Sequence, residues 1–303
     1  MSPRVLVTGA GGFIGRTTLS PLVERGFEVH AVTSRHSTVP VIDGVRWHEC
    51  NLLASEQVDP LVRRVAAEHL LHLAWYTVPG DFYSSPENLR WVEATVSLIR
   101  RFAAAGGRRV VAAGTCSEYD LSSGLCIEQT TPLRPANLYG ASKHAVQAVL
   151  AAASDQLQLT TAWARIFFVY GPREHPQRLV ASTIRSLLRG EPALCRHGDT
   201  VRDYLHVADV GSALAALTAS DLGGPVNVGS GDPLRLRDLA STVGRQLGRS
   251  GLVSFGPQGL PPDEPSVVLA DVGRLRDDLH WSPGLSLESG VADAIRWHRD
   301  NPG

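Results

Sequence analysis

The sequence has few of the features on which several classes of protein depend. Its four cysteines (Cys50, Cys116, Cys126 and Cys195) show no C-x-x-C or Cys/His ligand spacing, which argues against a disulfide framework or a metal site. No apolar run reaches the ~18 residues that a membrane span needs. The formal net charge of −1 gives no reason to expect nucleic acid or an anionic membrane as a partner. An apolar strand begins almost at once, at Val5, which leaves no room for a signal peptide. We therefore expect a cytoplasmic protein with reduced thiols.

Lysine is almost absent as well. Of 29 lysines and arginines, only Lys143 is a lysine. Tyr139 precedes it by four residues, so on a helix the two side chains project from one face. An ammonium beside a phenol lowers the pKa of the phenol, and a tyrosine tuned in this way can exchange a proton in catalysis. We predict that Tyr139 and Lys143 act as a pair, and that Lys143 lowers the pKa of Tyr139.

What is present is an alternation of strand-like and helix-like segments. Expected strands are 28–33, 70–74, 109–113 and 160–169, and expected helices are 16–25, 86–105, 138–155, 177–188 and 233–247. Such alternation predicts an α/β fold, a doubly wound parallel Rossmann sheet with a smaller C-terminal substrate lobe. We assign residues 1–171 with 205–230 to the dinucleotide-binding domain and residues 172–204 with 231–303 to the smaller lobe.

The first strand runs into a glycine-rich turn. The segment Thr8–Gly15 follows an apolar run and precedes a helix, the context in which such a turn holds a pyrophosphate. NAD-binding folds commonly end the second strand with an acidic residue for the ribose 2′-hydroxyl. This chain has Ser34 and Arg35 there, a pair that suits a 2′-phosphate. The expected cofactor is therefore NADP(H), with NAD(H) as the alternative and a solvated surface arginine as the plainer interpretation of Arg35.

Taken in order, these pieces resemble the extended short-chain dehydrogenase/reductase family, the NAD-dependent epimerase/dehydratase type. The likeness is nearest to the nucleoside-diphosphate 4-keto-6-deoxyhexose reductases, and it covers nearly the whole chain. The matching segments are Thr8–Gly15, Asn51–Leu52, His72–Ala74, Thr115–Tyr119, Tyr139 with Lys143, Arg165–Pro172, Arg202–Val210, Asn227–Gly231 and His280–Pro283. A run of this length in the right order does not arise by chance.

The resemblance implies a division of roles. It makes Tyr139 the proton donor or acceptor, Lys143 the holder of the nicotinamide ribose, and Thr115 a hydrogen-bond partner of the same substrate oxygen. The implied cofactor-binding residues are Gly9, Gly12, Phe13, Ile14, Gly15, Ser34, Arg35, Asn51, Leu52, Leu73, Ala74 and Lys143. The implied substrate-binding residues are Thr115, Cys116, Ser117, Tyr139, Arg173 and Arg202. Trp75, Tyr76 and Trp91 are expected near the substrate mouth or in the core.

Departures from the family pattern narrow the chemistry. Family dehydratases carry an Asp-Glu pair after the active-site threonine, where this chain has Cys116 and Ser117. Double epimerases carry a cysteine two residues after it, where Ser117 stands, although His175 keeps that chemistry open. Phe168 replaces the usual asparagine before V-Y-G, and Pro261–Glu264 lies where relatives often carry an arginine for the diphosphate.

Three functions follow from these observations. The first is an NADPH-dependent ketoreductase acting on a nucleoside-diphosphate 4-keto-6-deoxy sugar. The second is an NAD-dependent sugar-nucleotide 4-epimerase, which needs the same Tyr139, Lys143 and Thr115. The third, less favoured, is a non-catalytic cofactor-binding sensor. Ala141, Ala145, Ala148 and Ala152 would lie on one helix face, and the family uses this helix to form a homodimer.

Overall fold

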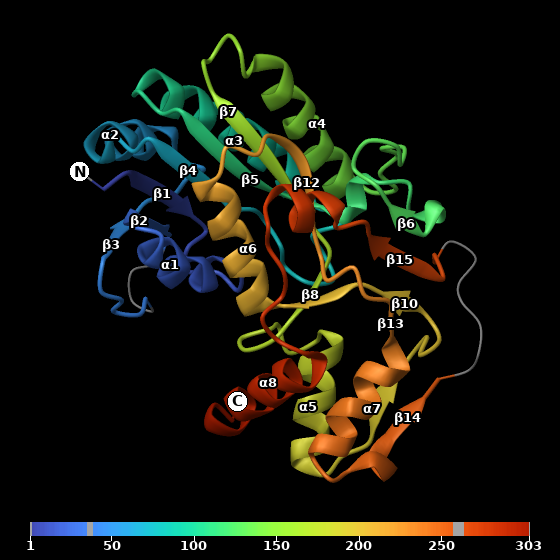
Figure 1. The fold of residues 1–303 in the computed structure, drawn as a ribbon. Helices are drawn as coiled ribbons and strands as arrows, with labels where there is room; N and C mark the ends of the chain where they lie inside the picture. The colour runs from blue at the N-terminus through green and yellow to red at the C-terminus, as the bar shows by residue number, and fades with distance from the viewer. Residues whose placement is uncertain (1, 35–38, 257–263, 303) are drawn as a thin grey trace.

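The computed structural model describes residues 2–34, 39–256 and 264–302. Its centre is one parallel sheet (Figure 1). In spatial order the strands are β12 (Gly224–Val228), β7 (Thr160–Ile166), β5 (Arg109–Thr115), β4 (His69–His72), β1 (Arg4–Thr8), β2 (Glu28–Thr33) and β3 (Val45–Glu49). The order reverses at β1, and a parallel sheet places its ligands outside the carboxyl ends of the strands at such a switch point.

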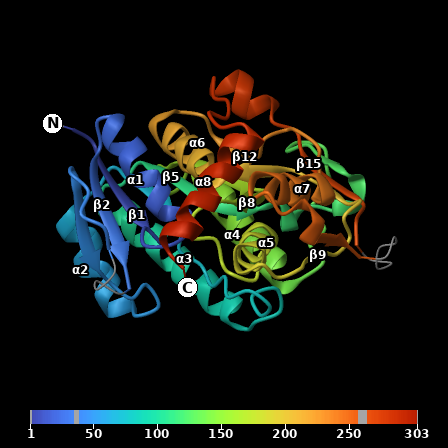
Figure 2. The same cartoon turned by 90° about the horizontal axis from the view of Figure 1, so that it is seen from below.

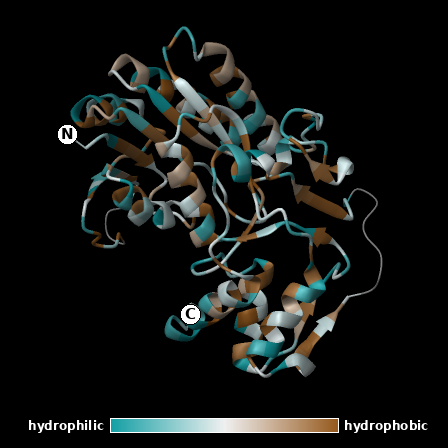
Figure 3. Ribbon diagram, in the orientation of Figure 1, coloured by the Kyte–Doolittle hydropathy of each residue, from teal (hydrophilic) through white to brown (hydrophobic). Residues whose placement is uncertain are grey.

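Helices cover both faces of this sheet, which confirms the predicted α/β doubly wound fold. α1 (Gly15–Glu24) and α6 (Val207–Ala219) pack together on one face. α2 (Ser55–Val65), α3 (Glu87–Ala104) and α4 (Leu138–Ala153) lie on the other (Figure 1). Because both faces are buried, the inner strands are apolar almost throughout, and Figure 3 shows brown and white along them.

A smaller lobe lies below the carboxyl ends of the strands (Figure 1). Its helices α5 (Leu179–Arg189), α7 (Leu236–Gln246) and α8 (Leu287–Asp300) share one apolar core. Its small sheets pair β9 (Ala193–Cys195) with β14 (Val253–Phe255), β8 (Phe168–Tyr170) with β11 (Tyr204–His206), and join β13 (Leu234–Arg235), β10 (Val201–Arg202), β15 (Val267–Ala270) and β6 (Leu125–Cys126). In Figure 2, which views the molecule from below, α8, α7 and α5 are seen to the right of β1 and β2.

One predicted strand is wrong in an instructive way. The single strand expected over 160–169 is two strands in different sheets. The break falls at Phe167, whose N–H donates to Val228 in the central sheet, whereas the N–H of Phe168 donates to Asp203 in the lobe. An unbroken apolar run does not reveal that the chain changes partners in its middle. The change carries the chain from the sheet into the lobe and leaves a cavity between them.

Candidate active site

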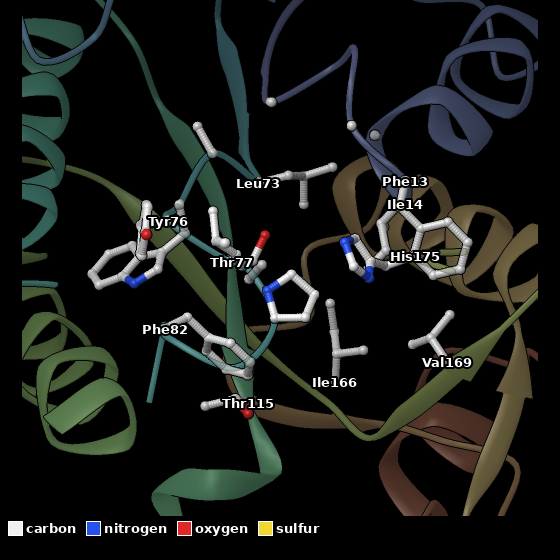
Figure 4. A pocket seen from close by; sticks show the side chains of 18 of the residues that line it. Phe13, Ile14, Leu73, Tyr76, Thr77, Phe82, Thr115, Ile166, Val169 and His175 are labelled. Atoms are coloured by element: carbon white, nitrogen blue, oxygen red, sulfur yellow. The ribbon is translucent and has the colours of Figure 1, made fainter. Parts of the chain in front are cut away.

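The cavity between sheet and lobe has a volume of about 1340 Å³. It is lined by the segments that follow β1, β2, β4 and β5, by α4, and by the loop between β8 and α5 (Figure 4). At this size and in this position it is the natural binding site of the fold for a cofactor together with a substrate.

The glycine-rich turn forms the wall under α1. Gly9 has a φ of 67°, and a Cβ there would lie 2.7 Å from the backbone nitrogen of Ala74. A Cβ on Gly15 would lie 2.1 Å from the carbonyl oxygen of Gly9. The backbone can therefore fold tightly under the N-terminus of α1, where unpaired N–H groups attract a phosphate. Gly9, Gly12, Phe13, Ile14 and Gly15 all line the cavity, as the sequence predicts, and this cradle fits a dinucleotide.

The far end of this wall continues along β2 and β3. Ser34, Asn51 and Leu52 line it, and so do Leu73 and Ala74 after β4. Sequence reasoning missed the neighbouring lining residues Val32, Thr33, Cys50 and Leu53. The position after an apolar strand is itself the signal that would have found them. Arg35 lies outside the described residues.

The predicted catalytic residues meet at the other end. Thr115 is the last residue of β5, and Tyr139 and Lys143 stand one turn apart on α4, which begins where Asn137 accepts a hydrogen bond from the N–H of Gly140 at 2.9 Å. All three line the cavity. The side chains of Thr115 and Tyr139 lie close enough for Thr115 to lower the pKa of the phenol. The structure thus brings together the threonine, tyrosine and lysine that the sequence proposed.

The electrostatics of the pair differ from the prediction. Burial raises the pKa of Tyr139 well above its usual value, and only the side chain of Thr115 opposes that rise. Lys143 donates instead to the carbonyl of Ala113 at 2.8 Å, and burial lowers the pKa of its own ammonium to about 7. The pKa of Tyr139 is therefore raised, contrary to the expectation that Lys143 lowers it, because burial penalises the charged phenolate.

Behind Thr115 lies a buried carboxylate that sequence reasoning missed. Glu118 accepts hydrogen bonds from the N–H of Thr115 at 2.8 Å, from Trp163 Nε1 at 2.9 Å and from Arg165 Nε at 2.9 Å. Arg165 continues the network, since its Nη1 donates to the hydroxyl of Tyr119 at 2.9 Å. The T-x-x-E spacing of a capping box was the available signal. Glu118 fixes the strand end that carries Thr115.

The residues after Thr115 supply no acid or base. Cys116 is buried among apolar side chains, and burial raises the pKa of its thiol to about 12. It is therefore protonated near neutral pH, and the interpretation of Cys116 as a packing residue is favoured. Ser117 lines the cavity beside it.

The two arginines predicted to bind substrate lie in different places. Arg173 lines the cavity, with its guanidinium 5.8 Å from the ring centre of Trp297. Arg202 is buried behind Phe168, is ion-paired with Glu264, and does not line the cavity among the described residues. The role of Arg202 in substrate binding stays a prediction, and its ion pair with Glu264 is the contact that a substrate would have to compete with.

Arg178, unlike Arg202, is exposed. It lines the cavity, and its guanidinium lies 5.9 Å from the ring centre of Phe82. That ring makes an edge contact of 4.9 Å with Tyr139. Trp75, Tyr76 and Trp91 also line the cavity, as expected of a substrate mouth, while Trp75 and Trp91 pack on the core as well. Figure 4 shows Phe82 beside Thr115, with His175 across the cavity near Phe13 and Ile14.

Over the described ranges, 2–34, 39–256 and 264–302, the side chains form no His, Cys, Asp or Glu cluster suited to a metal ion. In those same ranges, no helix has the length and apolar character to cross a membrane.

A Rossmann-type sheet, a phosphate cradle at the switch point and a Tyr-x-x-x-Lys pair beside a threonine define an enzyme built around a nicotinamide dinucleotide. The model of the NAD dependent epimerase/dehydratase family matches residues 5–229. The chain belongs to this family, the extended short-chain dehydrogenase/reductases.

Individual relatives cover the whole chain. A UDP-glucose 4-epimerase of Streptomyces lividans is 28% identical over 330 residues, covering 100% of this chain and 98% of the relative. The structure of MoeE5 with UDP-glucose and NAD is 31% identical, with a TM-score of 0.84 and coverage of 99% and 100%. A Thermus thermophilus UDP-glucose 4-epimerase with NAD is 26% identical, with a TM-score of 0.83 and coverage of 98% and 99%. Decarboxylases and dehydratases of sugar nucleotides are also among the relatives.

Proposed function

We propose that this enzyme carries out oxidation and reduction at a single carbinol carbon of a sugar nucleotide, as a 4-epimerase. The observation that carries the proposal is the meeting of Thr115 and Tyr139 at the cavity wall with no carboxylate in the two positions that follow Thr115. Such a site can move one proton at one oxygen, and the relatives that match the chain over nearly its whole length include UDP-glucose 4-epimerases.

Each residue has a role set by its position. In the oxidation, Tyr139 would act as its phenolate, accept the proton of the substrate hydroxyl and return it in the reduction, while Thr115 would orient that oxygen. Lys143 would hold the nicotinamide ribose, and the glycine turn would hold the pyrophosphate. A bound nicotinamide dinucleotide supplies the hydride chemistry. Burial raises the pKa of Tyr139, so this role requires that its pKa fall when substrate and cofactor bind.

A 4-epimerase needs no second base to remove a proton from the carbon beside its keto group. Elimination of water or inversion beside the carbonyl requires a group that removes a proton from carbon. Cys116, with its thiol pKa of about 12 and its buried position, does not meet that need, and Ser117 is not a base. Dehydration is therefore disfavoured, whereas His175, which lines the cavity, leaves double epimerisation open.

A second candidate is the NADPH-dependent 4-keto-6-deoxy sugar reductase. The observation in its favour is the hydroxyl pair Thr33 and Ser34 after β2, where both residues line the cavity and neither carries the carboxylate that favours NAD. In this case hydride moves in one direction only, and the cofactor must exchange after every turnover.

Cofactor content separates the two candidates. We would denature the purified protein, assay the released nucleotide, and titrate the cofactor-free form with NADPH and NADH by fluorescence. Stoichiometric NAD+ together with conversion of UDP-glucose to UDP-galactose is the expected result. Weak, exchangeable binding that favours NADPH, with oxidation of NADPH by a 4-keto-6-deoxy sugar nucleotide, would replace the epimerase by the reductase.

We also propose a homodimer formed through α3 and α4. Ala141, Ala145, Ala148 and Ala152 are exposed along α4, and Leu89 and Val149 expose 55% and 50% of their surface. Light scattering after size exclusion should give twice the mass of one chain, and Val149→Glu should give the mass of one. A cytoplasmic location, with all four cysteines reduced as the structure has them, completes the proposal.

A further inference from the structure

The only lysine of the chain lies against an aromatic ring. The ammonium nitrogen of Lys143 is 3.9 Å from the ring centre of Trp75 and donates to the carbonyl of Ala113 at 2.8 Å. Lys143 is buried, so its charge has lost most of its contact with water. A tryptophan face is the strongest of the aromatic partners for a cation, and the attraction grows when water is excluded.

The ring of Trp75 is itself held in place. Its indole N–H donates to Asn88 Oδ1 at 2.8 Å. Asn88 is fully buried, and its amide donates to the carbonyls of Phe82 at 2.7 Å and Ser85 at 2.9 Å. Because every polar atom of this side chain has a partner, Asn88 fixes the indole in one orientation.

Asn88 also connects the two halves of the catalytic pair. The loop that it ties down carries Phe82, whose ring contacts Tyr139 edge-on at 4.9 Å, and Tyr83, whose carbonyl accepts the N–H of Tyr139 at 3.1 Å. One buried amide therefore positions the ring that faces Lys143 and the loop that faces Tyr139.

We propose that Trp75 is a positioning residue for catalysis: its indole face holds the Lys143 ammonium, charged and in place, for the nicotinamide ribose. The inference rests on the proposed function in that Lys143 serves the cofactor. It adds a residue with no polar contact to substrate that controls where the catalytic charge lies.

The ionisable groups His72 and Glu118 do not replace the ring of Trp75 as the partner of the Lys143 ammonium. His72 on β4 is neutral, since burial and then the charge of Lys143 lower its pKa to about 3. Glu118 favours the charged lysine, but its oxygens are bonded to Thr115, Trp163 and Arg165. A carboxylate placed against Lys143 would form an ion pair and compete with the ribose hydroxyls. An aromatic face stabilises the ammonium and leaves its hydrogen atoms free to donate.

The test uses the single lysine. ε-15N-lysine gives one side-chain NMR signal, whose titration is the titration of Lys143. Nonsense suppression places tryptophan with one, two or three ring fluorines at position 75 alone. The fluorines weaken the attraction of the ring face for a cation and hardly change the size of the ring. The pKa of Lys143 in the cofactor-free protein should fall stepwise, by roughly half to one pH unit over the series. The dissociation constant of NAD+ should rise in the same order.

The same fluorinated residues at position 91 are the matched control, because Trp91 also lines the cavity and contacts Trp75 at a ring distance of 6.2 Å without facing the lysine. They should leave the Lys143 titration where it is. Identical titrations across the position-75 series would overturn the inference, as would NAD+ affinity that is unchanged while the pKa falls. The titration needs neither substrate nor turnover. If the pKa of Lys143 does not change across the series and the enzyme is still an active epimerase, the role of Trp75 is rejected and the proposed function is not.

Discussion

The two ends of the cavity are built in different ways. The cofactor end consists of short contiguous segments at the carboxyl ends of β1, β2 and β4, where the glycine turn presents backbone rather than side chains. The substrate end consists of side chains from the 76–86 loop, the 172–178 loop and α8. At the first end one local motif makes one site. At the second, a residue such as Arg202 matches a motif and is nevertheless neutralised by Glu264, 62 positions away. A local motif therefore predicts a site well where the backbone of that motif forms the site, and less well where side chains from distant parts of the chain form it.

A large effect on cofactor binding is expected at the glycine turn. Gly15→Ala places a Cβ 2.1 Å from the carbonyl oxygen of Gly9, where backbone must move. Binding of NAD+ and NADPH should fall more than 100-fold, about 2.8 kcal/mol or more, as measured by fluorescence titration. Gly251→Ala is the control, since a Cβ there meets nothing within 4 Å. Equal affinity in the two variants would show that the turn does not carry the site.

Tyr139→Phe tests the point at which the two ends meet. It removes the hydroxyl beside Thr115 and keeps the ring packed on Phe82. Turnover should fall by about 10²- to 10⁴-fold, the usual contribution of a positioned acid-base group, while cofactor binding changes little. Thr115→Ala should lower turnover less. Retention of wild-type turnover by Tyr139→Phe would favour the non-catalytic sensor.

His72 offers a pH test of the cofactor end. Its side chain bonds Thr8 at 2.7 Å and Thr95 at 2.9 Å, and its pKa is lowered to about 3 from 6.5. Between pH 6.5 and about 3, His72 is therefore protonated in the unfolded chain but not in the folded one. The free energy of unfolding should fall as the pH drops through this range, by up to about 1.4 kcal/mol per pH unit.

Urea unfolding of wild type and of His72→Gln across that pH range measures this contribution. The variant should be less stable at pH 7 and should lose less of its stability on acidification. Subtracting the two profiles removes the buried carboxyls such as Glu174, whose raised pKa acts in the opposite sense. Parallel profiles would mean that His72 does not titrate on unfolding.

The smallest effect is expected at the substrate end. Arg178→Gln should weaken binding of UDP-sugars by roughly tenfold, the value of a charged hydrogen bond at a partly solvated site. Arg202→Gln should weaken it less, because Glu264 already holds that guanidinium. Isothermal titration with UDP and UDP-glucose, with melting temperatures measured in parallel, makes the comparison. A larger loss for Arg202→Gln would support the role that the motif implied.

The sequence alone determined the fold class, the glycine turn and the Thr115, Tyr139 and Lys143 set. The glycine turn and the Tyr139–Lys143 pair depend on spacing within one segment, where local geometry converts sequence separation into position, whereas Thr115 was found through the resemblance to the family. The capping-box spacing at Thr115 and Glu118 was equally local, and attention to it would have found the buried carboxylate.

Only the tertiary structure decided the remaining features. It broke the segment 160–169 into strands of two sheets, paired Arg202 with Glu264, and set Lys143 on Trp75. It also reversed the expected direction of the Tyr139 pKa. In each case the outcome depends on burial and on groups far away along the chain, and the free energy of a charge is set by all the atoms that replace its water rather than by its neighbour in a motif.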